Sequence, residues 1–148
     1  AQIAMLTAEK VRQYDIEPRI AMLSFSNFGS THHPMSDKVR AAVEIVKKKM
    51  PKLMIDGEMQ ADTAIVPEII NEIYPFSTLK GGANVLVCPG LTSANIAYKL
   101  LARLGDATAV GPILMGIRKP VYLLIPGNDV IDIVNITAMA VQDAQFSE

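Results

Sequence analysis

The sequence predicts an α/β fold in which a mainly parallel sheet is flanked by helices. Segments with the length and composition of strands alternate with segments that carry apolar residues at helical spacing. The strand segments are apolar without interruption, as is typical of strands covered on both faces. The chain has 148 residues, of which 50% are hydrophobic, and it shows no internal repeat and no linker. These features predict one structural unit over residues 1–148 with a core of its own.

The first elements follow from apolar spacing and from residues that begin or end helices. Residues 1–14 are predicted as a helix, because apolar residues recur there at helical spacing. No capping residue precedes this helix, so we expect a piece of a longer chain, although a processed N-terminus would look the same. Residues 19–24 are predicted as a buried strand. The next helix is expected to begin at Pro34, which suits a first helical turn, and to end before Pro51.

The rest of the chain continues the alternation. Further strands are expected at 53–56, 83–88, 107–116 and 121–125. Helices are expected at 67–74, from a cap at Thr92 or Ser93 to Gly105, and from a cap at Asn128 or Asp129 to about Gln142. The helix before Gly105 has one apolar face, and the last helix is apolar nearly all round. Both apolar surfaces are therefore expected to be buried.

Charge and composition exclude several classes of partner. The net charge is −1, from 14 basic and 15 acidic residues, so no basic field attracts nucleic acid. No apolar run reaches the roughly 20 residues of a membrane span. Cys88 is the only cysteine, which excludes an intrachain disulfide and predicts a cytoplasmic location. The high apolar content predicts that a partner covers part of the surface.

The loop after the first predicted strand, SFSNFGSTHHP, is a candidate ligand site. Hydroxyl and amide side chains gather around Gly29, directly ahead of a helix. Backbone N–H groups in such a loop can receive a phosphate or a carbonyl oxygen. The same residues also favour ordinary turns, and composition alone favours that alternative. The candidates in this loop are Ser24, Ser26, Asn27 and Ser30.

The histidines and a group of acidic residues offer other chemistry. His32 and His33 are adjacent and have no second ligand group, so no metal site is predicted, and His33 is expected to cap a helix. Asp56, Glu58 and Asp62 could serve acid–base chemistry or hold a divalent ion. A structural role is the alternative, and the spacing favours it.

Two helices carry polar residues that need an explanation. Asn95 lies on the face of its helix opposite the apolar face, where solvation is the default. Asp132 and Asn135 form a thin polar strip on the last helix. Buried polar groups need partners, so we expect this strip to meet protein, water or ligand.

Seven segments in order resemble the phosphate acetyltransferase/butyryltransferase family and, within it, the C-terminal region of bacterial NADP-dependent malic enzymes. They are SFSNFGS, HP, DGEMQAD, ANVLVCP, LTSANIAYKLLARLG, GPILMGIRKPV and DIVNITAMAVQ, and they cover nearly the whole chain. The resemblance implies an isocitrate dehydrogenase-like fold with two subdomains, a CoA cleft between them, and dimerisation through the second. This chain would be the C-terminal part of such a domain, mostly its second subdomain.

The chain departs from the family pattern where the family performs its chemistry. The family has a Ser-Arg pair at the positions of Ile125 and Pro126, whereas the family aspartate is present as Asp132. A family lysine in the loop after SFS is replaced by Phe28. Loss of one charge-stabilising donor typically costs roughly 10²–10³-fold in rate. We therefore predict no catalytic residue in this chain.

The resemblance implies a regulatory, acetyl-CoA-sensing and dimerising domain of an NADP-dependent malic enzyme, itself catalytically inert. The parent would decarboxylate malate oxidatively to pyruvate with NADP and a divalent cation, both held by an upstream malic-enzyme domain. The chain itself is expected to hold no cofactor and no metal, and to form a homodimer or a higher homo-oligomer. The expected acyl-CoA-binding residues are Ser24, Ser26, Asn27, Ser30, Asn95, Asp132 and Asn135.

Two alternatives stay open. One is an active phosphate acetyltransferase whose catalytic cation comes from elsewhere, with Arg118 and Lys119 as candidates. The other is an oligomerisation module with a vestigial cleft.

Overall fold

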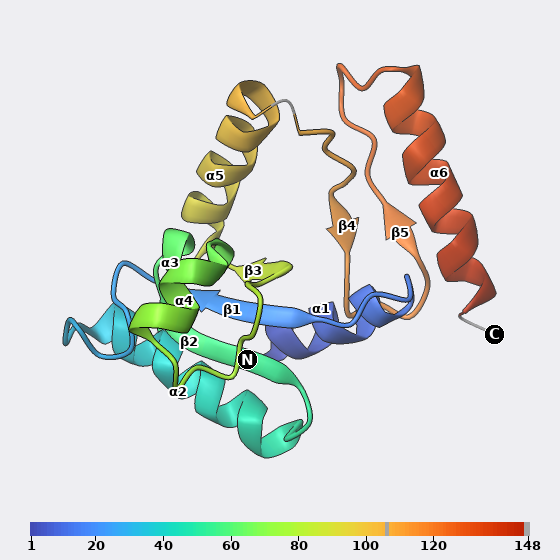
Figure 1. Ribbon diagram of the computed structural model, residues 1–148. Coiled ribbons are helices and arrows are strands. Elements are labelled where there is room, and N and C mark those ends of the chain that lie inside the picture. Colours follow the sequence, from blue (N-terminus) through green and yellow to red (C-terminus); the bar gives the residue numbers. More distant parts are fainter. Residues whose placement is uncertain (106, 147–148) are drawn as a thin grey trace. The chain divides into compact units, whose positions relative to one another are not determined.

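The computed structural model describes residues 1–105 and 107–146, and the chain divides into two compact units. Unit 1 is Ala1–Ile96 and unit 2 is Ala97–Glu148. Unit 1 holds α1 (Gln2–Arg12), β1 (Arg19–Leu23), α2 (Pro34–Lys49), β2 (Met54–Met59), α3 (Ala61–Ile65), α4 (Pro67–Ile73) and β3 (Val85–Val87) (Figure 1). Helix α5 (Leu91–Leu104) crosses the boundary, and unit 2 continues with β4 (Ile113–Leu114), β5 (Val121–Tyr122) and α6 (Val130–Gln145).

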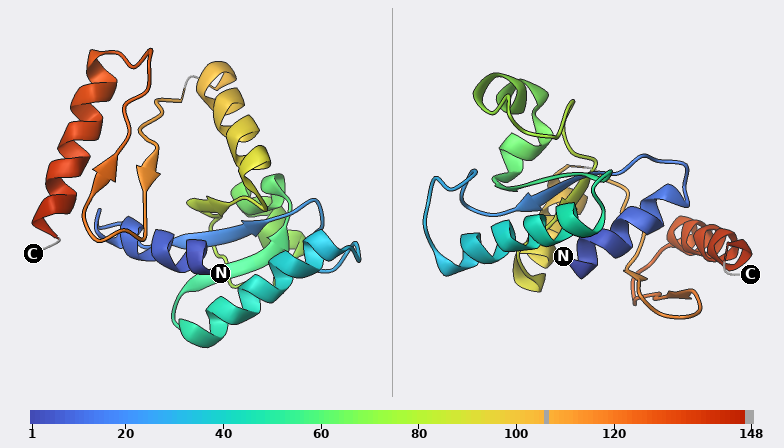
Figure 2. Two further views of the ribbon diagram at one scale, coloured as in Figure 1. Left: turned by 180° about the vertical axis from the view of Figure 1, so that it is seen from behind. Right: turned by 90° about the horizontal axis from the view of Figure 1, so that it is seen from below.

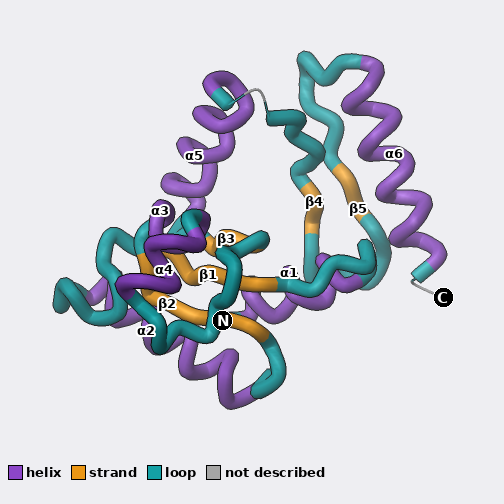
Figure 3. The backbone as a smooth tube through the Cα atoms, viewed as in Figure 1, coloured by secondary structure: helices purple, strands orange, loops and turns teal. Residues whose placement is uncertain are grey.

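The sheet of unit 1 is parallel, which confirms the predicted fold class. Its strand order is β2-β1-β3, and β1 pairs with both neighbours (Figure 3). Ile20 of β1 lies opposite Ile55 of β2 and Val85 of β3. A short turn cannot join two parallel strands. Helix α2 therefore makes the crossover from β1 to β2.

Helices cover both faces of this sheet, as the continuous apolar strands predict. Helices α1 and α2 lie on one face, and α3 and α4 lie on the other (Figure 2). Alternate residues of β1 enter two separate apolar clusters. Ile20 and Met22 pack with α1 and α2, whereas Ala21 and Leu23 pack with α3 and α4. Both clusters lie within unit 1, so this unit has a core on each side of its sheet.

Local capping chemistry sets the start of α2. His33 is the N-cap, and its Nδ1 accepts a hydrogen bond from the backbone N–H of Met35 at 3.1 Å. Pro34 occupies the first turn, where a missing N–H costs nothing, and three lysines lie in the last turn. The predicted cap and helix are confirmed. Strand β2 runs to Met59, three residues beyond its predicted end.

Unit 2 and helix α5 correct three expectations. Strands β4 and β5 pair antiparallel, so the predicted parallel arrangement applies only to unit 1. Helix α5 begins at Leu91, and the Ser93 hydroxyl donates to the Gly90 carbonyl at 2.9 Å instead of capping the helix. The apolar face of α5 is exposed in the described chain, with Leu104 81% exposed. Apolar periodicity identifies the face that needs cover, but it does not identify the surface that covers it.

Helix α6 begins as predicted and is exposed where burial is expected. Asp129 is its N-cap and forms a capping box with Asp132. Only Ile136 and Asp143 are buried among the residues of α6 that the structure describes, and Val130 is 77% exposed. The expectation of a buried last helix is therefore wrong for this chain by itself. Within the described residues, no helix is both long and apolar enough to cross a bilayer.

Candidate functional site

The candidate loop, residues 24–31, follows the carboxyl end of β1 and lies against the end of β2. The Ser24 N–H donates to the Met59 carbonyl at 2.8 Å, and the Phe28 N–H donates to the Glu58 carbonyl at 2.8 Å. In open α/β sheets, ligands bind beyond the carboxyl ends of the strands. The position of loop 24–31 is therefore the position of a ligand site in this class of fold.

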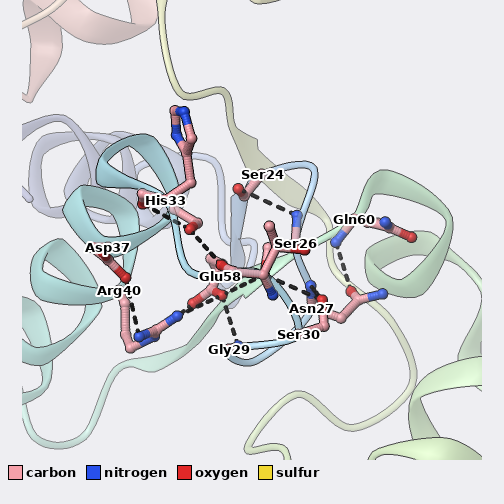
Figure 4. A network of polar contacts seen from close by, with 12 residues as sticks. Ser24, Ser26, Asn27, Gly29, Ser30, His33, Asp37, Arg40, Glu58 and Gln60 are labelled. Atoms are coloured by element: carbon pink, nitrogen blue, oxygen red, sulfur yellow. Dashed lines mark hydrogen bonds and ion pairs between the residues drawn. The ribbon is translucent and has the colours of Figure 1, made fainter.

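A buried carboxylate organises the loop (Figure 4). Glu58 is 0% exposed, and its two oxygens accept four hydrogen bonds from outside its own residue. Arg40 of α2 donates from Nε and Nη2, each at 3.0 Å. The Ser26 hydroxyl donates at 2.9 Å and the Gly29 N–H donates at 2.7 Å. One carboxylate thus joins β2, α2 and two points of loop 24–31.

The electrostatics of this pair keep both groups charged. Burial by itself raises the pKa of Glu58, but the hydrogen bonds from Arg40, Gly29 and Ser26 outweigh burial and hold the pKa below its ordinary value. The hydrogen bond to Glu58 raises the pKa of Arg40. At neutral pH, Glu58 is therefore ionised and fully hydrogen-bonded, which suits a structural role better than proton transfer.

The backbone of the loop is already satisfied by the protein. Each N–H from residue 26 to residue 31 donates to an acceptor within unit 1. In chain order, the acceptors are Ser24 Oγ, Ser30 Oγ, the Glu58 carbonyl, Glu58 Oε1, the Asn27 carbonyl and Ser26 Oγ. The Glu58 carboxylate takes one of these donors, the Gly29 N–H, and the other five reach hydroxyl and carbonyl oxygens of the protein. The expectation that these backbone groups receive a phosphate therefore does not hold in this conformation.

Side chains remain as the groups that this loop can offer to a ligand. Asn27 Oδ1 accepts from the Gln60 N–H at 2.8 Å, and Gln60 Nε2 donates to the Phe25 carbonyl at 2.8 Å. Within residues 1–105 and 107–146, Asn27 Nδ2 meets no acceptor. The half-buried Ser24 accepts one long contact of 3.4 Å at its hydroxyl. Asn27 and Ser24, together with the exposed Thr31 hydroxyl, are thus the side chains of this loop with donors to spare.

The other acidic residues do not join Glu58 in one site. Asp56 is 5% exposed and accepts from Lys47 Nζ at 2.9 Å, Ser77 Oγ at 2.9 Å and the Thr78 N–H at 2.8 Å. Burial raises the pKa of Asp56, and these hydrogen bonds together lower it below its ordinary value. Asp62 accepts from the N–H of the next residue. Among the described residues, no three potential metal ligands gather.

The predicted residues outside the loop lie on helices. Asn95 is exposed on α5, within unit 1. Asp132 and Asn135 are half-buried on α6, within unit 2. Asp132 Oδ2 accepts from Asn128 Nδ2 at 3.0 Å and from the Asp129 N–H at 3.2 Å. Asp132 is therefore engaged in capping α6, and its binding of a ligand stays a prediction.

The positions of the family Ser-Arg pair form a tight turn. The Asn128 N–H donates to the Ile125 carbonyl at 3.1 Å, and Gly127 has φ +96°. Proline at the second position and a positive φ at the third are features of a type II turn. The Asn128 side chain closes the turn from outside, because its Oδ1 accepts from the Ile125 N–H at 2.7 Å. Ile125 and Pro126 thus give this segment a rigid turn and no charged donor.

Sequence reasoning missed Arg40, and it missed the role of Phe28. Arg40 and Lys47 lie seven residues apart, two turns of one helix, and their partners Glu58 and Asp56 lie two apart on one strand. Two cations on one face of a helix, followed by two acids on one face of the next strand, were the available signal. Phe28 packs on Tyr74 and Phe76, with ring centroids 5.0 Å and 4.9 Å away.

Comparisons with known proteins agree with the resemblance of the segments. Residues 1–141 match the family model described as phosphate acetyl/butaryl transferase. The NADP-dependent malic enzyme of Escherichia coli K12 is 50% identical over 98% of this chain, which spans 19% of that enzyme. The phosphate acetyltransferase of Bacillus subtilis 168 is 45% identical over 97% of this chain, which spans 45% of that protein. The crystal structure of a phosphotransacetylase from Streptococcus pyogenes superposes with a TM-score of 0.91 and 46% identity, over 99% of this chain and 44% of that one.

Proposed function

The chain belongs to the phosphate acetyl/butaryl transferase family, and on that premise we propose that it binds acetyl-CoA as a regulatory effector and transfers no acyl group. The family by itself leaves the choice open, because the relatives include both malic enzymes and phosphate acetyltransferases. The chemistry of the individual positions has to decide between recognition and catalysis.

The turn at Ile125 and Pro126 is the observation that carries the proposal. Acyl transfer to phosphate develops negative charge, which a preorganised cation must stabilise. An isoleucine and a proline supply none, and the turn is closed by Asn128 at both its N–H and its side chain. Asp132 has one oxygen engaged twice in the cap of α6, by the Asn128 side chain and by the Asp129 N–H, and the turn before it places no arginine beside it. The segment can therefore contact a ligand but lacks the groups for transfer.

In this proposal the effector acts on a malic enzyme. The 50% identity to the Escherichia coli malic enzyme supports a place in such a polypeptide, whose other part would hold NADP and a divalent cation and oxidise malate to pyruvate. Acetyl-CoA would then change the rate of malate oxidation by binding one conformation of this domain more tightly than another. A cytoplasmic homodimer is part of the same proposal. The exposed apolar residues of α5 and α6 support an interface there.

The second candidate is a phosphate acetyltransferase in its own right. The 45% identity to the Bacillus subtilis enzyme favours it. Arg118 and Lys119 are exposed and precede the turn in the sequence, so they are the cations that could replace the missing arginine. A third candidate, an oligomerisation module, needs only the exposed apolar helices.

Three measurements on the intact natural polypeptide separate these candidates. We expect calorimetry to detect acetyl-CoA binding, and we expect acetyl-CoA to change the rate of malate oxidation. A coupled assay should find no acetyl phosphate from acetyl-CoA and phosphate above background. Acetyl phosphate formation that disappears in Arg118→Ala or Lys119→Ala would establish the second candidate. Absence of binding heat together with a dimer in sedimentation would establish the third.

A further inference from the structure

We propose that Glu58 and Arg40 are positioning residues that hold Asn27 in place for the ligand. This inference rests on the proposed function, because it assumes that loop 24–31 contacts acetyl-CoA. It goes beyond that function by assigning the affinity of the loop to two residues that do not touch the ligand.

The hydrogen bonds of Glu58 bracket Asn27. The carboxylate accepts from Ser26 at 2.9 Å and from the Gly29 N–H at 2.7 Å, one on each side of Asn27 in the chain. The Gln60 N–H then holds Asn27 Oδ1 at 2.8 Å. With its oxygen fixed, the amide has one orientation, and its Nδ2 group is placed before a ligand arrives. Such preorganisation raises affinity, because less freedom is lost on binding.

Arg40 makes the buried carboxylate possible. A buried charge without a partner is costly, and Arg40 provides a bidentate one through Nε and Nη2 at 3.0 Å each. The planar fork also sets the direction of the Glu58 carboxylate, because both oxygens are engaged at once. Arg40 is about one-third exposed at its side chain and belongs to neither apolar cluster. The Glu58–Arg40 pair therefore fixes the conformation of loop 24–31 and contributes no apolar packing to either core cluster.

Asp56 and Lys47 offer a matched control on the same two elements. Lys47 lies on α2 and Asp56 on β2, and the two cations have similar side-chain exposures, 35% for Arg40 and 36% for Lys47. The Asp56 carboxylate holds the segment at Ser77 and Thr78 and, among the described residues, makes no hydrogen bond to loop 24–31. If affinity depends only on having ion pairs between α2 and β2, variants of either pair should lower it. If affinity depends on the position of loop 24–31, only variants of the Glu58–Arg40 pair should lower it.

The test compares Glu58→Gln with Asp56→Asn in the intact natural polypeptide, by hydrogen exchange and by acetyl-CoA calorimetry. In Glu58→Gln we expect exchange of the Gly29 and Thr31 amides to accelerate at least about tenfold and acetyl-CoA affinity to fall about tenfold. In Asp56→Asn the Thr78 amide should exchange faster, while acetyl-CoA affinity stays within about twofold of wild type.

A second pair of variants covers the case that Glu58→Gln does not fold. Arg40→Lys keeps the positive charge and loses the bidentate fork, and Lys47→Arg is its control. We expect acetyl-CoA affinity to fall in Arg40→Lys and to stay at the wild-type value in Lys47→Arg. A further check is Glu58→Ala in acetate buffer, where the added carboxylate should restore the protection of the Gly29 amide.

The outcomes separate the inference from the function on which it rests. Wild-type protein that gives no binding heat with acetyl-CoA overturns the proposed function. Wild-type binding with equal loss of affinity in the Glu58 and Asp56 variants overturns the positioning role alone. Unchanged amide exchange in Glu58→Gln overturns it as well, whatever the affinity.

Discussion

Replacement of Ser26 by alanine tests the network around the buried carboxylate most directly. Ser26 is 0% exposed, donates to Glu58 at 2.9 Å and accepts from the Thr31 N–H at 3.0 Å. A hydrogen bond to a charged group contributes about 1.5–3 kcal/mol. The Thr31 N–H loses its acceptor too, but Thr31 is exposed, so water replaces part of that bond. We expect Ser26→Ala to lower the free energy of unfolding by about 2 kcal/mol.

Ser36→Ala is the matched control for this variant. Ser36 is also 0% exposed, and its hydroxyl donates to the Thr31 carbonyl at 2.8 Å and to the His33 carbonyl at 2.9 Å. Both acceptors are neutral and belong to exposed residues that water can reach. The same loss of one oxygen atom should therefore cost only about 1 kcal/mol.

Urea unfolding followed by far-ultraviolet circular dichroism measures both variants, with hydrogen exchange of the β1 amides to report on unit 1 by itself. The difference between the variants should shrink as the pH falls below the ordinary range of a glutamate. Protonation of Glu58 turns the Ser26 bond into one between neutral groups, which is weaker. A Ser36→Ala cost equal to or above that of Ser26→Ala, or a difference that acid leaves unchanged, would refute the reasoning.

Three further predictions concern acid stability, helix capping and backbone space. The pKa values of Glu58 and Asp56 are lowered in the folded state, so below about pH 4.5 the unfolded chain binds more protons than the folded chain. The free energy of unfolding should therefore fall as the pH drops below that value, and it should fall less steeply in Glu58→Gln. Urea titrations that give the same free energy at every acid pH would contradict this. Asp129→Ala removes the side-chain cap of α6 and should cost about 1 kcal/mol, seen as faster amide exchange in its first turn; unchanged exchange there would exclude a capping role. Gly57→Ala should destabilise the fold by at least about 2 kcal/mol, measured by thermal unfolding. Gly57 has φ +140°, and an added Cβ would lie 2.6 Å from the Met22 carbonyl oxygen. A melting temperature equal to that of wild type would show that the backbone moves to accept the Cβ.

Local patterns in the sequence predict the elements of unit 1 except α3, and they predict several helix ends along the chain. The parallel sheet follows from uninterrupted apolar strands. The sequence places the cap of α2 at His33 and the cap of α6 at Asn128 or Asp129, and the structure shows Asp129. Ser26, Asn27 and Ser30 could be placed together because they are neighbours in one loop. These are interactions over a few residues, and spacing in the chain is enough to foresee them.

Only the tertiary structure decides how the polar groups of the site are used. Glu58 meets Gly29 across 29 residues and Arg40 across 18, so no local pattern shows that the loop donors are engaged by a carboxylate of the protein itself. The exposure of α5 and α6 and the antiparallel pairing of β4 with β5 are decided in the same way. Sequence determines which groups the chain carries and which faces are apolar. Which donor meets which acceptor depends on distances that exist only after the chain has folded, because a hydrogen bond acts over about 3 Å.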